Sequence, residues 1–159
     1  FAQRPKVDDS LRVYGDITKL HIGKGTRIDA FCVITVGEKG VWIGDNVHLG
    51  VGVCIFGAAG KVTIGNGCSL SPRSTIYTAS DDFRKAGLIG PTNPREQRNV
   101  IEGDVTMEEE SALGHGAVMF PGSMLEKRAT VKAYVLVIGR VEAGCTVIRT
   151  HTYHQEERR

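Results

Sequence analysis

The sequence predicts an all-β solenoid, in which short strands wind repeatedly around one apolar axis. Ile43, Leu49 and Ile55 are spaced six residues apart, and the same spacing recurs from Ile64 to Ile76. A six-residue period matches neither an α-helix, with about 3.6 residues per turn, nor the alternation of a simple strand. The chain of 159 residues also contains 20 glycines and one Trp, which indicates many tight turns. Repetition of this kind within one chain is typical of solenoid domains.

The remaining positions of each six-residue unit are restricted too. Glycine often follows the aliphatic residue directly, as at Gly23, Gly44, Gly50, Gly65 and Gly114. The fourth residue after the aliphatic one is small or β-branched in twelve units: Thr26, Cys32, Val47, Val53, Cys68, Ser74, Ser111, Ala117, Ser123, Ala129, Val135 and Val141. We therefore expect each unit to be a short strand with an inward aliphatic side chain, a sharp turn that glycine permits, and a small inward residue at the corner.

The first part of the repeat has a longer period of 21 residues. Three six-residue units are followed by an insertion of three residues, so that Ile22, Ile43 and Ile64 occupy the same place in the repeat. We expect the insertions, at residues 36–40 and 57–61, to bulge at one corner of the coil.

The period also defines the predicted parts of the chain. The step of six stops at the segment SDDFRKAGLIGPTNPREQRNVIEGD and then continues from Met107 to Val137. A loop this long inside a compact repeat is usually functional or disordered, and the apolar Phe83, Leu88 and Ile89 within it favour function. We predict a coiled domain at 22–141 with a loop at 80–104, an irregular N-terminal cap at 1–21, and a C-terminal cap and tail at 142–159.

Composition and charge exclude several classes of function. A formal net charge of +2 is too small to favour nucleic acid as a partner. No apolar run approaches the ~18 residues of a membrane span, and no signal peptide is recognisable. The four cysteines, Cys32, Cys54, Cys68 and Cys145, form no C-x-x-C pair. We expect reduced packing cysteines and a cytoplasmic protein.

The pattern aliphatic–Gly–x–x–small–x resembles the hexapeptide repeat of left-handed β-helix acyltransferases. More narrowly, VTIGNGCSLSPRSTIYTASDDF and RNVIEGDVTMEEESALGHGAVMFPG resemble galactoside O-acetyltransferase and related sugar acetyltransferases, over roughly residues 43–137. The resemblance implies a left-handed parallel β-helix of triangular coils. It also implies a homotrimer that transfers acetyl from acetyl-CoA to a hydroxyl or amine of a small sugar-like acceptor, in a groove between subunits.

The resemblance implies a general base at the start of the loop, and there this sequence differs. In IYTASDD, Asp81 stands where those enzymes have a histidine. A carboxylate with a pKa near ~4 is a weak base for a sugar hydroxyl unless burial raises the pKa, and it is better suited to an amine acceptor. His48 and His115 are the other candidates for the base. Pairing of His48 with Asp81 would let the carboxylate orient the imidazole.

The resemblance assigns binding roles to further residues. His115 and Ala133 match contacts of the pantetheine arm of CoA, and His48 matches a position near the acceptor. Arg140 and Arg149 are expected to replace a lysine at the CoA phosphates, with loss of CoA binding as the alternative. The acceptor site is predicted at Gly50, Asp82 and Phe83, where Gly50 stands in place of an asparagine. For His48 and His115 the alternative is a solvated histidine on a polar face.

The two alternative functions are a zinc enzyme and a non-catalytic scaffold. A trimeric carbonic anhydrase also uses this prism, but His21, His48 and His115 lack the closely spaced pair of its zinc site, so we predict no metal. His151 and His154, in a charged tail, are expected to be solvated.

The main competing hypothesis is a non-catalytic trimeric scaffold with a degenerate active site. Both hypotheses share the trimer, which outward apolar residues such as Val51, Tyr77 and Tyr134 favour.

Overall fold

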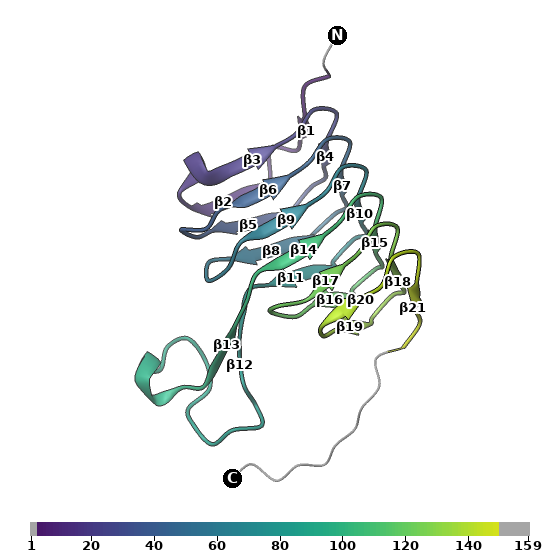
Figure 1. Cartoon of the computed structure of the whole chain (residues 1–159). Helices are drawn as coiled ribbons and strands as arrows, with labels where there is room; N and C mark the ends of the chain where they lie inside the picture. The colour runs from purple at the N-terminus through teal and green to yellow at the C-terminus, as the bar shows by residue number, and fades with distance from the viewer. Residues whose placement is uncertain (1–2, 150–159) are drawn as a thin grey trace.

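The computed structural model describes residues 3–149, which form a prism of stacked coils with one protruding arm (Figure 1). Three parallel sheets of seven, six and six strands make the three faces of the prism. The first face contains β1 (Lys6–Val7), β4 (Arg27–Ile28), β7 (His48–Leu49), β10 (Ser69–Leu70), β15 (Ala112–Leu113), β18 (Thr130–Val131) and β21 (Thr146–Val147). The second face contains β2 (Arg12–Gly15), β5 (Val33–Val36), β8 (Cys54–Gly57), β11 (Thr75–Tyr77), β16 (Val118–Met119) and β19 (Leu136–Val137). The third face contains β3 (Leu20–Ile22), β6 (Val41–Ile43), β9 (Val62–Ile64), β14 (Val105–Met107), β17 (Met124–Leu125) and β20 (Arg140–Val141).

Parallel pairing in register explains the six-residue period. On the first face, consecutive coils align Ile28, Leu49, Leu70, Leu113 and Val131 in one column. These side chains point into the prism and are at most 4% exposed. Burying an aliphatic side chain of this size stabilises the fold by roughly 1.5–3 kcal/mol. The column continues through every coil, so the apolar core runs the length of the prism. The predicted all-β coil is confirmed.

The corners account for the turn residues of the repeat. Between the first and second faces, Phe31, Gly52, Arg73, Gly116 and Tyr134 all have φ between 59° and 71°. This is the left-handed region, which glycine enters freely and other residues enter at a cost of about 1–2 kcal/mol. The corner is therefore built by one backbone conformation that five successive coils repeat, even where the side chain is bulky.

The chain near the N-terminal end of the prism is more regular than the sequence suggests. Residues 6–22, where an irregular cap is expected, contain β1, β2 and β3, and these pair in parallel with the next coil. An end coil has a neighbour on one side only, so Leu11, Val13, Leu20 and Ile22 pack on the core while staying partly exposed. This weakens the sequence pattern without removing the coil. Residues 150–159 of the predicted tail, including His151 and His154, lie outside the described residues.

Where the sequence predicts a loop at 80–104, the structure has a protruding arm with two short strands. It consists of the antiparallel strands β12 (Ala79–Asp81) and β13 (Val100–Glu102), joined by a segment that contains the 3-10 turn η2 (Arg95–Gln97). It leaves the prism between the second and third faces and projects away from it (Figure 1). A second 3-10 turn, η1 (Ile17–Lys19), lies in the first coil. Among residues 3–149, no helix has the length and apolarity that crossing a membrane requires.

Gly50 illustrates how closely the coils approach one another. It is buried, and a Cβ built there would lie 2.8 Å from the backbone nitrogen of Pro72 on the next coil. We expect Gly50→Ala to lower the free energy of unfolding by about 1–3 kcal/mol, because the two coils would have to separate. Equilibrium denaturation measures this change.

Ser71 gives a matched control for that substitution. It occupies the position of Gly50 on the next coil, since Leu49 pairs with Leu70, and its side chain is half-buried. Ser71→Ala should stay within about 0.5 kcal/mol of the wild type. Equal stability of the Gly50→Ala variant and the wild type would contradict this account of the coil contact.

Candidate active site

His48 lies on the outward side of the first face and is paired with a carboxylate. Its Nε2 is 2.8 Å from Oδ2 of Asp29, which follows β4 on the preceding coil. The Asp29 side chain is 17% exposed and that of His48 is 42% exposed. Arg27 Nε donates to the other carboxylate oxygen, Oδ1, at 2.6 Å. The result is a row of three charged or titratable side chains in which Asp29 holds the central place.

The environment of Asp29 favours its charged form. Partial burial disfavours ionisation, but the hydrogen bonds from His48 and Arg27 outweigh it, so the pKa of Asp29 lies below its ordinary value. An ionised carboxylate only accepts hydrogen bonds. His48 must therefore carry its proton on Nε2 when it is bonded to Asp29.

His115 is placed at the corner between the first and second faces. Its ring meets the Tyr134 ring edge-on, with centroids 5.3 Å apart and an interplanar angle of 81°. The Tyr134 backbone N–H donates to the His115 carbonyl at 2.8 Å. Gly116 makes this packing possible, because a Cβ there would lie 2.7 Å from the Tyr134 ring. His115 is partly buried as a result.

Two of the residues predicted to bind CoA share this corner with His115. Ala133 is exposed one coil further on. Because Val131 pairs with Val147, Arg149 follows β21 at the place that Ala133 takes after β18. These three residues form a column along one edge of the prism, which we call the corner column.

Arg140 does not join the corner column. It begins β20 on the third face, beyond the second face from His115, and its guanidinium is paired with Glu126. The structure therefore separates the two arginines that were predicted to act together, and leaves Arg149 as the one that continues the corner column.

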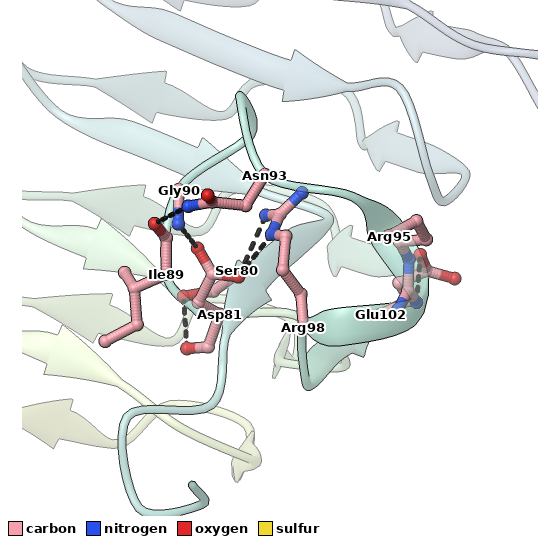
Figure 2. A network of polar contacts seen from close by, with 8 residues as sticks. All are labelled: Ser80, Asp81, Ile89, Gly90, Asn93, Arg95, Arg98 and Glu102. Carbon is pink, nitrogen blue, oxygen red and sulfur yellow. Dashed lines mark hydrogen bonds and ion pairs between the residues drawn. The ribbon is translucent and has the colours of Figure 1, made fainter. Parts of the chain in front are cut away.

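Asp81 lies at the outer end of β12, where the two strands of the arm open into the connecting segment, within a polar network (Figure 2). Arg98 donates to Oδ1 of Asp81 through Nε at 2.9 Å and pairs with the same oxygen through Nη2 at 2.8 Å. The Gly90 backbone N–H donates to Oδ2 at 2.9 Å. Both side chains are largely buried, with Asp81 10% and Arg98 14% exposed. The bond from Gly90 and the Arg98 guanidinium hold the pKa of Asp81 below its ordinary value despite this burial.

This network changes the interpretation of Asp81. Burial was the condition under which its carboxylate could become a stronger base, yet here its hydrogen bonds lower the pKa instead. The hypothesis of a His48–Asp81 pair is not met within one chain, because His48 bonds to Asp29 and Asp81 bonds to Arg98. Asp81 ties the two strands of the arm and its connecting segment together.

The predicted acceptor residues lie in different surroundings. Asp82 is 7% exposed, and its carboxylate accepts from Arg84 Nε and from the Arg84 backbone N–H, both at 3.1 Å. Phe83 projects from the arm and is 58% exposed. Gly50 is buried beneath Pro72 and has no side chain to offer a ligand. Within one chain, the arm and the corner column stand at opposite edges of the second face.

Three residues of the candidate site cannot be predicted from the inward positions of the repeat. Asp29, Arg98 and Tyr134 each contact a predicted site residue. The 21-residue period could have predicted the first of these contacts. Arg27 precedes His48 by 21 residues and lies beside it on the preceding coil, and Asp29 is only two residues after Arg27. Arg98 has no such signal, since the arm lies outside the period. Within residues 3–149, no group of three or more His, Cys, Asp or Glu residues could hold a metal ion.

Known proteins resemble the chain in both sequence and fold. No protein-family model matches it. The dTDP-4-amino-4,6-dideoxy-D-glucose acyltransferase of Escherichia coli is 33% identical over 138 residues, which cover 87% of this chain and 71% of the relative. The mitochondrial gamma carbonic anhydrase 1 of Arabidopsis thaliana is 30% identical over 135 residues, but this covers only 40% of that protein.

The structural relatives include AntD, an N-acyltransferase from Bacillus cereus. Its complex with dTDP and 3-hydroxybutyryl-CoA superposes with a TM-score of 0.84, at 25% identity over 90% of this chain and 74% of AntD. A variant in complex with dTDP-4-amino-4,6-dideoxyglucose and coenzyme A superposes at 0.85, with 21% identity over 99% of this chain and 86% of AntD. The predicted left-handed β-helix fold is confirmed by these superpositions.

The contact between Asp81 and Arg98 can be tested by its effect on hydrogen exchange in the arm. We expect Arg98→Met to speed hydrogen exchange at Gly90 and across residues 79–102, because it leaves a buried carboxylate without its cation. Peptides from the prism should keep their protection. Arg95→Met is the matched control, since its pair with Glu102 is far more exposed, at 57% and 49%. Equal effects of the two substitutions would contradict the assigned role of Asp81.

The same pair predicts how the arm responds to pH. The pKa of Asp81 is lowered, so its carboxylate stays ionised and bonded above the ordinary value of about 4. Exchange protection of Gly90, corrected for intrinsic rates, should hold from pH 7 to pH 5 and fall only at lower pH. Loss of protection already near pH 5 would show that the carboxylate is not held in this way.

Proposed function

This chain belongs to the hexapeptide-repeat sugar N-acyltransferases, and we propose that it transfers an acyl group from an acyl-CoA to the amino group of a nucleotide-linked sugar. The observation that carries the proposal is the 33% identity, over 87% of the chain, to an enzyme named for dTDP-4-amino-4,6-dideoxy-D-glucose. The AntD complexes support the same pair of ligands, a dTDP-linked amino sugar and a CoA thioester.

The contacts of Asp81 favour nitrogen over oxygen as the nucleophile, because Arg98 and the Gly90 N–H occupy the carboxylate that stands where the related O-acetyltransferases have their histidine base. A sugar hydroxyl needs a strong base, whereas a neutral amine attacks a thioester directly and needs only a group that takes up its proton. The amine nitrogen bonds to the thioester carbonyl carbon, the carbon–sulfur bond breaks, and free CoA leaves as the thiol. The products are an amide and CoA. The protein's contribution is mainly to hold the two substrates in line.

The corner column suits the CoA thioester. Ala133 has no bulk to obstruct the pantetheine arm, His115 offers a ring nitrogen beside it, and Arg149 offers a cation to the phosphates. Acetyl-CoA is the donor expected from the sequence. The 3-hydroxybutyryl-CoA bound to AntD makes longer acyl groups worth testing.

We propose that the working unit is a homotrimer. The outward side of the second face carries an apolar strip: in one register column Val33, Cys54, Val118 and Leu136 are apolar, with Thr75 between Cys54 and Val118 and Arg12 at the end. Phe56 and Tyr77 stack beside it, with ring centroids 5.1 Å apart. Packing of this face against another copy would bury it and bring the arm of one subunit to the corner column of the next.

We also propose a cytoplasmic location. The four cysteines are all free thiols, which fits a reducing compartment.

Release of CoA thiol tests the proposed reaction. The protein should release thiol from acetyl-CoA or 3-hydroxybutyryl-CoA when dTDP-4-amino-4,6-dideoxyglucose is present. dTDP-glucose, which has no amine, is the matched control and should give none. A scaffold with a degenerate site would release no thiol with either sugar.

Binding of CoA is a second test that distinguishes the enzyme hypothesis from the scaffold hypothesis. Free CoA at 100 times its dissociation constant should raise the free energy of unfolding by about 2.7 kcal/mol. Thermal denaturation with and without CoA measures this. No shift at saturating concentration, together with no thiol release, would favour the scaffold hypothesis.

A further inference from the structure

The contact between His48 and Asp29 has the form of an orienting pair. Asp29 Oδ2 meets His48 Nε2, while Asp29 Oδ1 is held by Arg27, so each oxygen has one donor. Arg27 and His48 are register neighbours on β4 and β7, adjacent strands of the first face (Figure 1). The carboxylate is therefore fixed from two sides and in turn fixes the imidazole ring.

The other nitrogen of His48 is left available. With the proton on Nε2, Nδ1 carries a lone pair, and among residues 3–149 it has no hydrogen-bond partner. The side chain is 42% exposed. It lies three residues before Val51, which turns the same corner as His115 two coils further on. His48 thus presents an unpaired proton acceptor on the outward side of the first face, four residues before Gly52, which turns the corner between the first and second faces.

We propose that Asp29 is a positioning residue that holds His48 with Nε2 protonated, so that Nδ1 accepts the proton of the attacking amine. The inference rests on the proposed acyl transfer. In the reaction, the proton passes from the amine nitrogen to Nδ1 as the carbon–nitrogen bond forms, and the imidazolium gives a proton back to the CoA sulfur as the carbon–sulfur bond breaks, so that CoA leaves as the thiol and His48 is neutral again. Asp29 keeps its own charge and stabilises the imidazolium that results.

Because Arg27 holds one oxygen of Asp29, the substitution Asp29→Asn has a defined effect on the protonation of the His48 ring. In Asp29→Asn, the side chain has one oxygen and one NH₂ group. The guanidinium of Arg27 can only donate, so it retains the amide oxygen and turns the NH₂ group toward His48. His48 Nε2 must then accept, and its proton moves to Nδ1. The substitution keeps the shape of the site but removes the proton acceptor.

Steady-state kinetics with acyl-CoA and the dTDP-linked amino sugar tests the role in catalysis. Asp29→Asn should lower kcat by ~10²-fold with little change in KM for acyl-CoA, and His48→Gln should lower it as much. The double variant Arg27→Met/Asp29→Asn should recover part of kcat, because the free amide can turn its oxygen to His48. Asp8→Asn is the matched control: Asp8 precedes Asp29 by one coil and bonds to Ser10 instead of an imidazole.

The ¹⁵N chemical shifts of His48 give a readout that does not depend on activity. The wild type should show a protonated Nε2, and Asp29→Asn a protonated Nδ1. Wild-type kcat in Asp29→Asn, or a protonated Nδ1 in the wild-type neutral ring, would overturn the inference while acyl transfer stands. Absence of transfer by the wild-type protein would overturn the proposed function and the role of His48 within it.

Discussion

The stacking of inward aliphatic residues in register is the constraint on which the rest of the structure depends. Leu49 lies over Leu70, and Leu70 over Leu113, so each coil can neither slide nor rotate against the next without exposing its core. Outward residues are fixed as a consequence. The column that buries Leu49 also places His48 beside Arg27, and through them determines the position of Asp29.

The same constraint explains why the candidate functional groups lie on the outside of the prism. The interior is filled by buried aliphatic and small side chains. A stacked coil can offer a substrate only its outward faces, its corners and any segment that leaves the repeat. Here those are the His48–Asp29 pair, the corner column and the arm. The arm and the corner column lie at opposite edges of the second face, so in the proposed homotrimer the arm of one subunit would meet the corner column of the next.

The sequence predicts the fold well because the repeat is a local signal that recurs. Ile43, Leu49 and Ile55 can be assigned to the core from spacing alone. The function of outward residues is harder to predict, because any polar residue is tolerated there. The sequence indicates His48 as a candidate base but suggests Asp81 as its partner, and Asp81 shares no repeat position with it. Asp29 follows from the 21-residue period once the coils are aligned.

The arm marks the limit of this approach. Asp81 and Arg98 are 17 residues apart in a segment without a period, and only the antiparallel pairing of β12 with β13 brings them together. Their contact reverses the expectation for the pKa of Asp81, which burial alone would have raised.

The central claim is that this chain acylates an amine carried by a nucleotide-linked sugar. Two-dimensional NMR of the product formed from acetyl-CoA labelled with ¹³C at the carbonyl tests it most directly. The account predicts a correlation between the labelled carbonyl and an amide proton on the sugar. A correlation to a sugar C–H through an ester oxygen, or recovery of the amino sugar unchanged, would contradict it.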